Sequence, residues 1–305
     1  MSGRKGKVMG GTFEATASLD YQGLELPALD AELRRVLDEG VHGLCFSAYL
    51  DGQGPEQQSQ LSPEQVRARM QIVRPHARWV RTFSCTDGNE AAPRMAHQQG
   101  LKTLVGAWLG PNENPATNEK ELARVIELAR AGDCDLVAVG NEVLYREDLT
   151  EDELIAYLRR VKEALPGIPV GYVDSYYLFC DHPRLVEACD VLLINCYPFW
   201  EKCSLANSLA YLQEMVSRVQ DVAGGKRVVL SETGWPSGGE PLGEAVPSPE
   251  NAIIYALNTF KWTQAAGLEL FYYAAFDEEW KAGPEGGAGP HWGFWDTQGK
   301  WKYGR

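Results

Sequence analysis

The feature that most constrains this fold is a series of eight short apolar runs, separated from one another by segments with helical character. Such alternation is typical of a parallel sheet whose strands are connected by helices. Eight is also the number of strands that closes a (β/α)8 barrel. We therefore expect an α/β barrel with strands within residues 43–49, 79–85, 102–109, 136–142, 169–175, 191–199, 227–235 and 268–278.

Three of the intervening segments carry start signals for helices. Ser62 is followed three residues later by Gln65, and Thr150 by Glu153, which is the spacing of a capping box. Ser248 precedes a proline, the residue favoured in the first turn of a helix. These signals predict that a helix begins after the loop that follows the strand in each of these three units, as a barrel requires.

Both ends of the chain depart from the regular alternation. Residues 1–27 precede the first helical pattern, so we assign them to an N-terminal extension and residues 28–305 to the barrel domain. After the eighth run the chain is rich in Gly and Trp, which predicts that the last helix is missing or replaced by a loop. Since no linker or low-complexity tract interrupts residues 28–305, a single domain is the simplest interpretation.

A doubly wound open sheet would also alternate strands and helices. If it bound a dinucleotide, a glycine-rich turn should follow its first strand. Gly52 and Gly54 follow the first run here, but they do not form GxGxxG and no helical pattern follows them at once. The barrel is therefore preferred.

Charge and hydropathy limit the possible partners. The net charge of −13 argues against nucleic acid as a partner, and no run approaches the roughly 20 apolar residues that cross a membrane. The first residues show no secretory signal, so we expect a cytoplasmic protein as written, or a secreted or periplasmic one if a signal was removed. We expect a monomer.

Polar residues gather at the ends of the predicted strands, where barrel enzymes carry their chemistry. They are Arg81, Asn141, Glu142, Asp174, Asn195, Tyr197, Ser231, Glu232 and the segment 277–281. Glu142 and Glu232 each close a mostly apolar run, which would shield their carboxyl groups in part from water. Burial raises the pKa of a carboxyl group and a nearby cation lowers it, so one glutamate could remain protonated while the other is ionised.

Two carboxyl groups in these two states are what cleavage of a glycosidic bond requires. A purely structural alternative also fits the residues. In that interpretation each glutamate pairs with a cation such as Arg81 or Lys281 and ties neighbouring strands together. Position and composition leave both interpretations open.

Two motifs resemble those of a known enzyme family. VVLSETGWPSGG at 228–239 resembles the segment around the nucleophile of glycoside hydrolase family 17, and VGNEV at 139–143 resembles the acid/base motif of that family. Further similar segments extend the resemblance over residues 43–303. The resemblance implies a (β/α)8 glycosidase that acts on β-1,3-glucan.

The resemblance also implies roles for individual residues. Glu142 would be the general acid/base and Glu232 the nucleophile. Asn141 would bind the sugar 2-hydroxyl, and Tyr197 would orient Glu232. Among the tryptophans near the strand ends, Trp235 lies inside the motif and is the strongest candidate for a ring on which glucose stacks.

Other residues complete the expected substrate-binding set. Glu278 and Lys281 match the accessory Glu and Lys of the family, although a structural salt bridge would place them together equally well. Phe46 stands where many members have Tyr, and the neighbouring Tyr49 could supply the missing hydroxyl group. We also expect Arg81 and Asp174, at their strand ends, to contribute to the binding site.

The function implied is that of a retaining endo-β-1,3-glucanase that hydrolyses laminarin-type glucans. A β-1,3-glucan transglycosylase using the same two glutamates is the alternative, and a non-catalytic glucan-binding barrel is a third. We expect no cofactor and no metal site, because the five histidines show no metal-ligand spacing.

Overall fold

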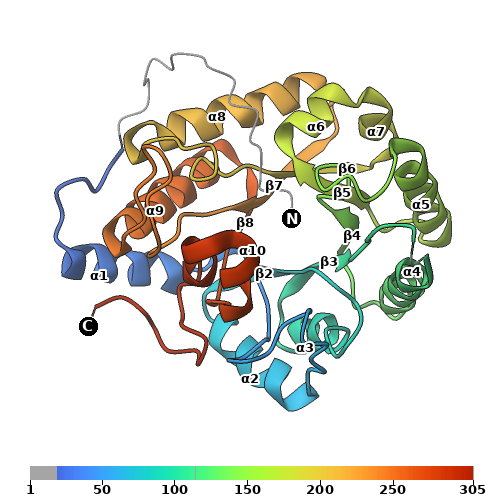
Figure 1. Cartoon of the computed structure of the whole chain (residues 1–305), viewed down its shortest axis with the longest axis horizontal. Helices are drawn as coiled ribbons and strands as arrows, with labels where there is room; N and C mark the ends of the chain where they lie inside the picture. Colours follow the sequence, from blue (N-terminus) through green and yellow to red (C-terminus); the bar gives the residue numbers. More distant parts are fainter. Residues whose placement is uncertain (1–18, 114, 305) are drawn as a thin grey trace.

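The computed structural model, which describes residues 19–113 and 115–304, forms a closed barrel of eight parallel strands in sequence order (Figure 1). This confirms the predicted fold class. The strands are β1 (Val41–Cys45), β2 (Ala77–Thr82), β3 (Lys102–Ala107), β4 (Leu136–Asn141), β5 (Val170–Ser175), β6 (Val191–Asn195), β7 (Arg227–Thr233) and β8 (Glu269–Tyr272).

Each strand is buried on both faces, by the barrel interior and by the surrounding helices. All five residues of β6 are buried, as are the last five of β3 and of β7. Nearly continuous apolar runs, rather than alternating ones, are what strands in this environment require. Most strands stop before the apolar run ends, and β8 ends six residues before Glu278, so the ends of the runs lie in loops at the barrel mouth.

Helices surround the barrel, and their starts follow the predicted caps. They are α1 (Leu26–Asp38), α2 (Pro63–Val73), α3 (Ala91–Gln98), α4 (Pro115–Arg130), α5 (Glu151–Ala164), α6 (Tyr176–Asp181), α7 (Pro183–Ala188), α8 (Leu205–Val222) and α9 (Pro249–Ala266). Ser248 and Ser62 cap α9 and α2, and Thr150 and Glu153 form a complete capping box on α5. At α2 the box is incomplete, because the Gln65 side chain bonds a carbonyl in the β1–α2 loop instead.

The position of the eighth helix is taken by a helix from the opposite end of the chain. After β8 the described residues form short helical turns, η1 (Glu279–Lys281), α10 (Ala282–Glu285) and η2 (Gly286–His291), so the predicted absence of a regular last helix is confirmed. Helix α1 packs beside α9 instead (Figure 1), with Leu29, Leu33 and Leu37 buried. The C-terminal segment fastens α1 through a hydrogen bond of 2.5 Å from Trp301 Nε1 to Asp30 Oδ1.

The described part of the predicted N-terminal extension lies against the barrel. Leu19 is buried in the core, and the backbone N–H of Asp20 donates to Asn258 Oδ1 on α9 at 2.8 Å. The Asp20 carboxylate also pairs with Lys261 at 2.5 Å. Residues 1–18, the rest of the predicted extension, lie outside the described residues, so its boundary stays a prediction.

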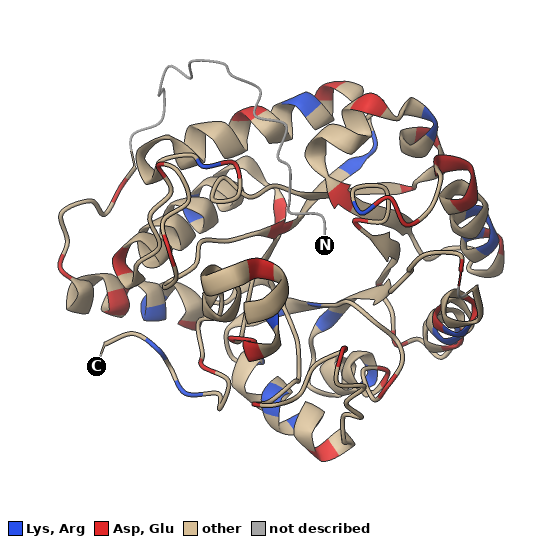
Figure 2. Cartoon of the chain, viewed as in Figure 1, with Lys and Arg blue, Asp and Glu red and all other residues tan. Residues whose placement is uncertain are grey.

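Charged residues are interspersed around the outside of the barrel. Figure 2 shows Lys and Arg alternating with Asp and Glu on the outer helices, for example along α1 and α5. No helix within residues 19–113 and 115–304 has the length and apolar character needed to cross a membrane.

Candidate active site

Glu142 is presented by an irregular turn at the end of β4. The pairing of β4 with β5 shifts register between Ala138 and Asn141. Gly140 has φ 83° and Glu142 has φ 52°, a left-handed conformation that is uncommon outside glycine. The turn is held in place by a hydrogen bond of 2.8 Å from the Glu142 N–H to the carbonyl of Val173. Strain of this kind persists only where the surroundings enforce it, and it is concentrated at functional sites.

Glu232 is a buried carboxylate near the end of β7, with 5% of its surface exposed. Its Oε1 accepts hydrogen bonds from Arg81 Nη1 at 2.6 Å and from Asn195 Nδ2 at 3.0 Å. Its Oε2 accepts one from the Tyr197 hydroxyl at 2.5 Å. Tyr197 therefore lies where the resemblance implies, against the candidate nucleophile.

These contacts favour the ionised form of Glu232. Burial by itself would raise the pKa of Glu232, but the positive charge of Arg81 and the hydrogen bonds from Tyr197 and Arg81 outweigh it, so the pKa lies below its usual value. The Arg81 guanidinium is fully buried as well, which would lower its pKa, but the charge of Glu232 raises it instead. Both shifts have the direction expected of a buried ion pair.

One side-chain amide lies between the two glutamates. Asn195 Nδ2, at the end of β6, is 3.0 Å from Glu142 Oε1 and 3.0 Å from Glu232 Oε1. The two carboxylate oxygens therefore cannot be further apart than twice that distance. Carboxyl groups held close together are typical of retaining glycosidases, in which they lie about 5–5.5 Å apart.

Arg81 connects the ends of three strands. Besides Glu232, it donates through Nη1 to the carbonyl of Ser231 at 2.8 Å, and through Nη2 to Asn141 Oδ1 at 2.7 Å. Because its oxygen accepts from Arg81, the Asn141 side chain has its amide N–H groups directed elsewhere. Arg81 is 1% exposed, so the expectation that it contacts substrate is corrected. Its side chain lies inside the barrel and holds Asn141 and Glu232 in position.

Asp174 also departs from the expectation of a substrate contact. It is completely buried, and its carboxylate accepts hydrogen bonds from the Tyr172 hydroxyl and from the backbone N–H groups of Tyr145 and Ser175. Burial raises the pKa of Asp174 to about 7, and the charge of Glu142 adds to the rise. Asp174 therefore supports the turn that follows Glu142, and no part of it faces the mouth.

Trp235 is part of the core, so the prediction that glucose stacks on it is wrong. Its side chain is 1% exposed, and its ring packs against Phe199 and Tyr255 with centroids 5.5 Å away in each case. Its Nε1 donates to the carbonyl of Val246 at 3.0 Å. A large ring next to a catalytic motif is as suitable for packing the barrel as for binding sugar, and sequence position does not separate the two.

The accessory pair lies on the β8 side of the mouth. Lys281 Nζ is 3.2 Å from Glu278 Oε2, so the salt bridge that the sequence left open is present. Burial raises the pKa of Glu278 to about 7, although hydrogen bonds from Ser47 and Trp280 partly oppose the rise. The charge of Lys281 also helps to lower the pKa of Glu232, so the accessory pair acts electrostatically on the candidate nucleophile.

Tyr49 lies on the same side of the mouth. Its ring meets that of Trp280 edge to face, and its hydroxyl accepts a hydrogen bond of 3.3 Å from Asn89. Phe46 is buried and packs against Phe276, so no polar group stands at that position. Whether Tyr49 replaces the family hydroxyl stays a prediction.

A cavity with aromatic walls opens on the opposite side of Glu142. It is lined by residues from the ends of β4, β5 and β6, which include Glu142, Tyr177, Asn195, Trp200 and Glu201. In barrel order, β4 and β5 lie across the barrel from β8 and β1. The candidate catalytic pair therefore has polar and aromatic residues on both sides.

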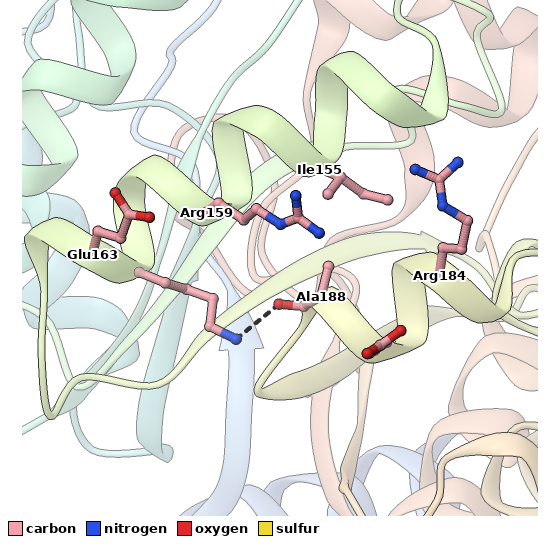
Figure 3. A pocket seen from close by; sticks show the side chains of 7 residues that line it. Ile155, Arg159, Glu163, Arg184 and Ala188 are labelled. Atoms are coloured by element: carbon pink, nitrogen blue, oxygen red, sulfur yellow. Dashed lines mark hydrogen bonds between the residues drawn. The ribbon is translucent and has the colours of Figure 1, made fainter.

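A second cavity lies on the outer wall between α5 and α7 and has a volume of about 330 Å3. Figure 3 shows Ile155, Arg159, Arg184 and Ala188 around it. The carbonyl of Ala188 accepts a hydrogen bond of 2.8 Å from Lys162 Nζ. The charged groups here tie helices to their surroundings: Lys162 also pairs with Asp190 at 2.7 Å, and Arg184 pairs with acidic residues of α5. This cavity is remote from the strand ends and takes no part in the site.

The sequence placed Asn195 and Ser231 at strand ends but gave no reason to select them. The Ser231 hydroxyl donates to Asn195 Oδ1 at 2.9 Å, and both residues are buried. The signal was their polarity at the end of otherwise apolar runs, which they share with residues outside the site. Among the described residues, no cluster of three or more His, Cys, Asp and Glu side chains could hold a metal ion.

Residues 43–293 match the sequence model of the BtgE/BtgC glycoside hydrolase domain. The chain is similar to a glucan 1,3-beta-glucosidase of Arthroderma benhamiae, with 31% identity over 76% of this chain and 80% of the relative. It is also similar to the glucan 1,3-beta-glucosidase BGL2 of Candida albicans, with 28% identity over 77% of this chain and 83% of the relative.

The structure is similar to that of an active-site mutant of Rhizomucor miehei beta-1,3-glucanosyltransferase in complex with laminaritriose. The TM-score is 0.77 and the sequence identity is 27%, over 87% of this chain and 96% of the other. The similarity thus extends over nearly the whole described barrel.

Proposed function

This chain belongs to glycoside hydrolase family 17 and acts on O-glycosyl bonds, and on that basis we propose that it is an endo-β-1,3-glucanase that cleaves with retention of configuration. The observation that carries the proposal is the pair Glu142 and Glu232, joined through one amide nitrogen at 3.0 Å from each. Retaining enzymes hold their carboxyl groups about 5–5.5 Å apart, so that one carboxylate itself attacks the anomeric carbon.

Glu232 is the better nucleophile of the two. Three hydrogen bonds, one of them from Arg81, favour its ionised form. Glu142 then acts as the general acid: it gives its proton to the departing glycosidic oxygen while Glu232 attacks and forms a glycosyl-enzyme. In the second step Glu142 takes a proton from water, and the water oxygen displaces Glu232.

The endo mode and the substrate are supported by the surroundings and by the relatives. Tyr49, Glu278 and Lys281 lie on one side of the pair and Tyr177 and Trp200 on the other, which provides for sugar units on both sides of the scissile bond. Both curated relatives are named glucan 1,3-beta-glucosidases, and the Rhizomucor enzyme was crystallised with laminaritriose.

The experiment is a time course of hydrolysis of a reduced laminari-oligosaccharide series, with products read by mass and the first anomer by NMR. We expect internal cleavage and a β anomer as the first product. Glu232→Gln should lower kcat at least about 10³-fold while laminari-oligosaccharide binding persists. Glu279→Gln, in an exposed glutamate close to the accessory pair, is the matched control and should leave kcat unchanged. An α anomer, or full turnover by Glu232→Gln, would refute the proposal.

Transglycosylation is the second candidate, and one observation favours it. The cavity beside Glu142 is lined by Tyr177 and Trp200, aromatic side chains on which an acceptor sugar could stack in place of water. The structurally similar Rhizomucor enzyme is a glucanosyltransferase. In the same time course, products longer than the substrate as the main early species would identify this activity instead of hydrolysis.

A further inference from the structure

We propose that Asn195 determines which oxygen of Glu142 carries the catalytic proton, and that Ser231 fixes Asn195 for this task. The proposal rests on the retaining mechanism proposed above. It concerns both catalytic carboxyl groups, because a single amide nitrogen contacts Oε1 of Glu142 and Oε1 of Glu232. Neither Asn195 nor Ser231 donates or accepts a proton in the reaction, so both are positioning residues.

The first step is the orientation of the amide. The Ser231 hydroxyl lies 2.9 Å from Asn195 Oδ1 and donates to it. Ser231 is 0% exposed and Asn195 is 2% exposed, so bulk water does not supply the amide with alternative hydrogen-bond partners. If the amide were turned over, its oxygen would face Glu232, whose surroundings favour the ionised form. Two acceptors would then oppose each other in a buried site, which is strongly unfavourable.

The second step follows from the chemistry of an amide. Asn195 Nδ2 carries two hydrogen atoms and is not an acceptor. One N–H therefore points to Glu232 Oε1 and the other to Glu142 Oε1, each at 3.0 Å. In a protonated carboxyl group one oxygen carries the hydrogen and the other accepts. Since Glu142 Oε1 is the accepting oxygen, the proton of the acid form must be on Oε2.

The third step concerns the charge of the pair through the reaction. Before cleavage Glu232 is ionised and Glu142 is neutral. When Glu142 Oε2 gives its proton to the glycosidic oxygen, the bond from that oxygen to the anomeric carbon breaks, and Glu232 becomes an ester while Glu142 becomes the anion. The two N–H groups of Asn195 contact both carboxyl groups. One of them therefore donates to the negative charge when it is on Glu232, and the other donates to it when it is on Glu142. A water molecule then gives a proton to Glu142 Oε2. The oxygen of that water bonds to the anomeric carbon and displaces the Glu232 carboxylate.

Other groups also set the charge balance of the two glutamates. Around Glu232 they are Arg81 from β2, Cys45 from β1, Tyr197 after β6 and Lys281 of η1; near Glu142 they are Asp174 of β5 and Tyr177 of α6. None of them contacts both carboxyl groups in the hydrogen bonds described, whereas Asn195 does. A change at Asn195 should therefore act on both limbs of the pH profile of kcat/KM.

The test combines kinetics with direct location of the proton. Asn195→Ala removes a hydrogen-bond donor from both anions, so both limbs should move to higher pH by about one to two units, the shift that loss of a hydrogen bond to a charged group produces. Ser231→Ala keeps Asn195 but releases its amide, so it should move both limbs in the same direction by less. Ser208→Ala, in a buried serine of α8 that bonds its own helix, is the control and should move neither limb.

Neutron diffraction of the deuterated wild-type protein, at a pH low enough to protonate Glu142, locates the proton without use of any substrate. We expect a deuteron on Glu142 Oε2 and both Asn195 deuterons directed at the two Oε1 atoms. A deuteron on Glu142 Oε1, a reversed amide, or unmoved limbs in a folded Asn195→Ala would overturn the inference. Failure of the proposed function would be seen separately, as absence of β-1,3-glucan cleavage by the wild type, and the neutron result would still decide the position of the proton.

Discussion

Replacing Arg81 by Met removes the charge that keeps Glu232 ionised while retaining most of the volume of the side chain. Arg81 and Glu232 are both buried, with Nη1 and Oε1 2.6 Å apart, so water cannot replace the lost partner. Removal of one member of a buried ion pair typically costs about 3–5 kcal/mol. Since a neighbouring arginine lowers a carboxyl pKa by roughly one to three units, the acidic limb of kcat/KM should move to higher pH by a similar amount.

The Arg81→Met substitution should also reverse the sign of the contribution that ionisation of Glu232 makes to the free energy of unfolding. In the wild type the pKa of Glu232 is depressed, so its contribution to stability is present above the unfolded value of about 4.3 and is lost as pH falls. Without Arg81, burial raises the pKa of Glu232 instead, and the contribution becomes a penalty that grows with pH. The difference in the free energy of unfolding between wild type and variant should therefore be larger at pH 7 than at pH 4.

Urea unfolding at several pH values and the pH profile of laminari-oligosaccharide cleavage measure the two effects. The double variant Arg81→Met/Glu232→Gln leaves no unpaired charge at this site, so it should recover much of the lost stability. Arg78→Met, at an exposed position on the same strand, should change stability by no more than about 0.5 kcal/mol. If Glu232→Gln restores nothing in the Arg81→Met background, the ion pair does not have the role described here.

Three further predictions concern residues outside the catalytic pair. Asp174→Asn should flatten the fall in the free energy of unfolding between about pH 4 and pH 7, because the raised pKa of Asp174 makes its ionisation a growing penalty over that range; an unchanged slope in urea titrations would contradict this. Trp235→Phe, which loses the bond to Val246, should lower stability by roughly 1–3 kcal/mol yet leave KM for glucan unchanged, and a several-fold rise in KM would restore Trp235 as a sugar platform. Leu33→Ala should cost about 2–5 kcal/mol in chemical denaturation if α1 completes the helical ring, whereas exposed Arg35→Ala should cost less than about 0.5 kcal/mol.

The barrel could be predicted from the sequence because its strands are buried on both faces. Residues 191–194 and 228–230 had to be apolar for that reason, and the polar residues that follow them mark the ends of the two strands. The same reasoning selected Glu142, Glu232 and Arg81 as strand-end groups. It could not assign Arg81 to the support of the site, because that depends on its 1% exposure and on contacts with residues 60 and 151 positions away.

The remaining errors and omissions have a common physical origin. Trp235, Asp174 and Asn195 all lie at strand ends, where a side chain can point to the mouth or into the packing around it, and one-dimensional spacing does not distinguish these directions. The role of α1 was missed for a different reason. A barrel needs a helix between its eighth and first strands, but sequence order does not require that helix to follow the eighth strand.

The contact between α1 and the C-terminal segment also determines when the barrel can be completed during synthesis. The hydrogen bond from Trp301 to Asp30 joins residues 271 positions apart, and α9, the other neighbour of α1, begins only at Pro249. The ribosome thus releases the apolar face of α1 long before the residues that cover it. Since long-range contacts form slowly and uncovered apolar surface promotes aggregation, the apolar face of α1 is most exposed to aggregation before α9 and Trp301 have been synthesised.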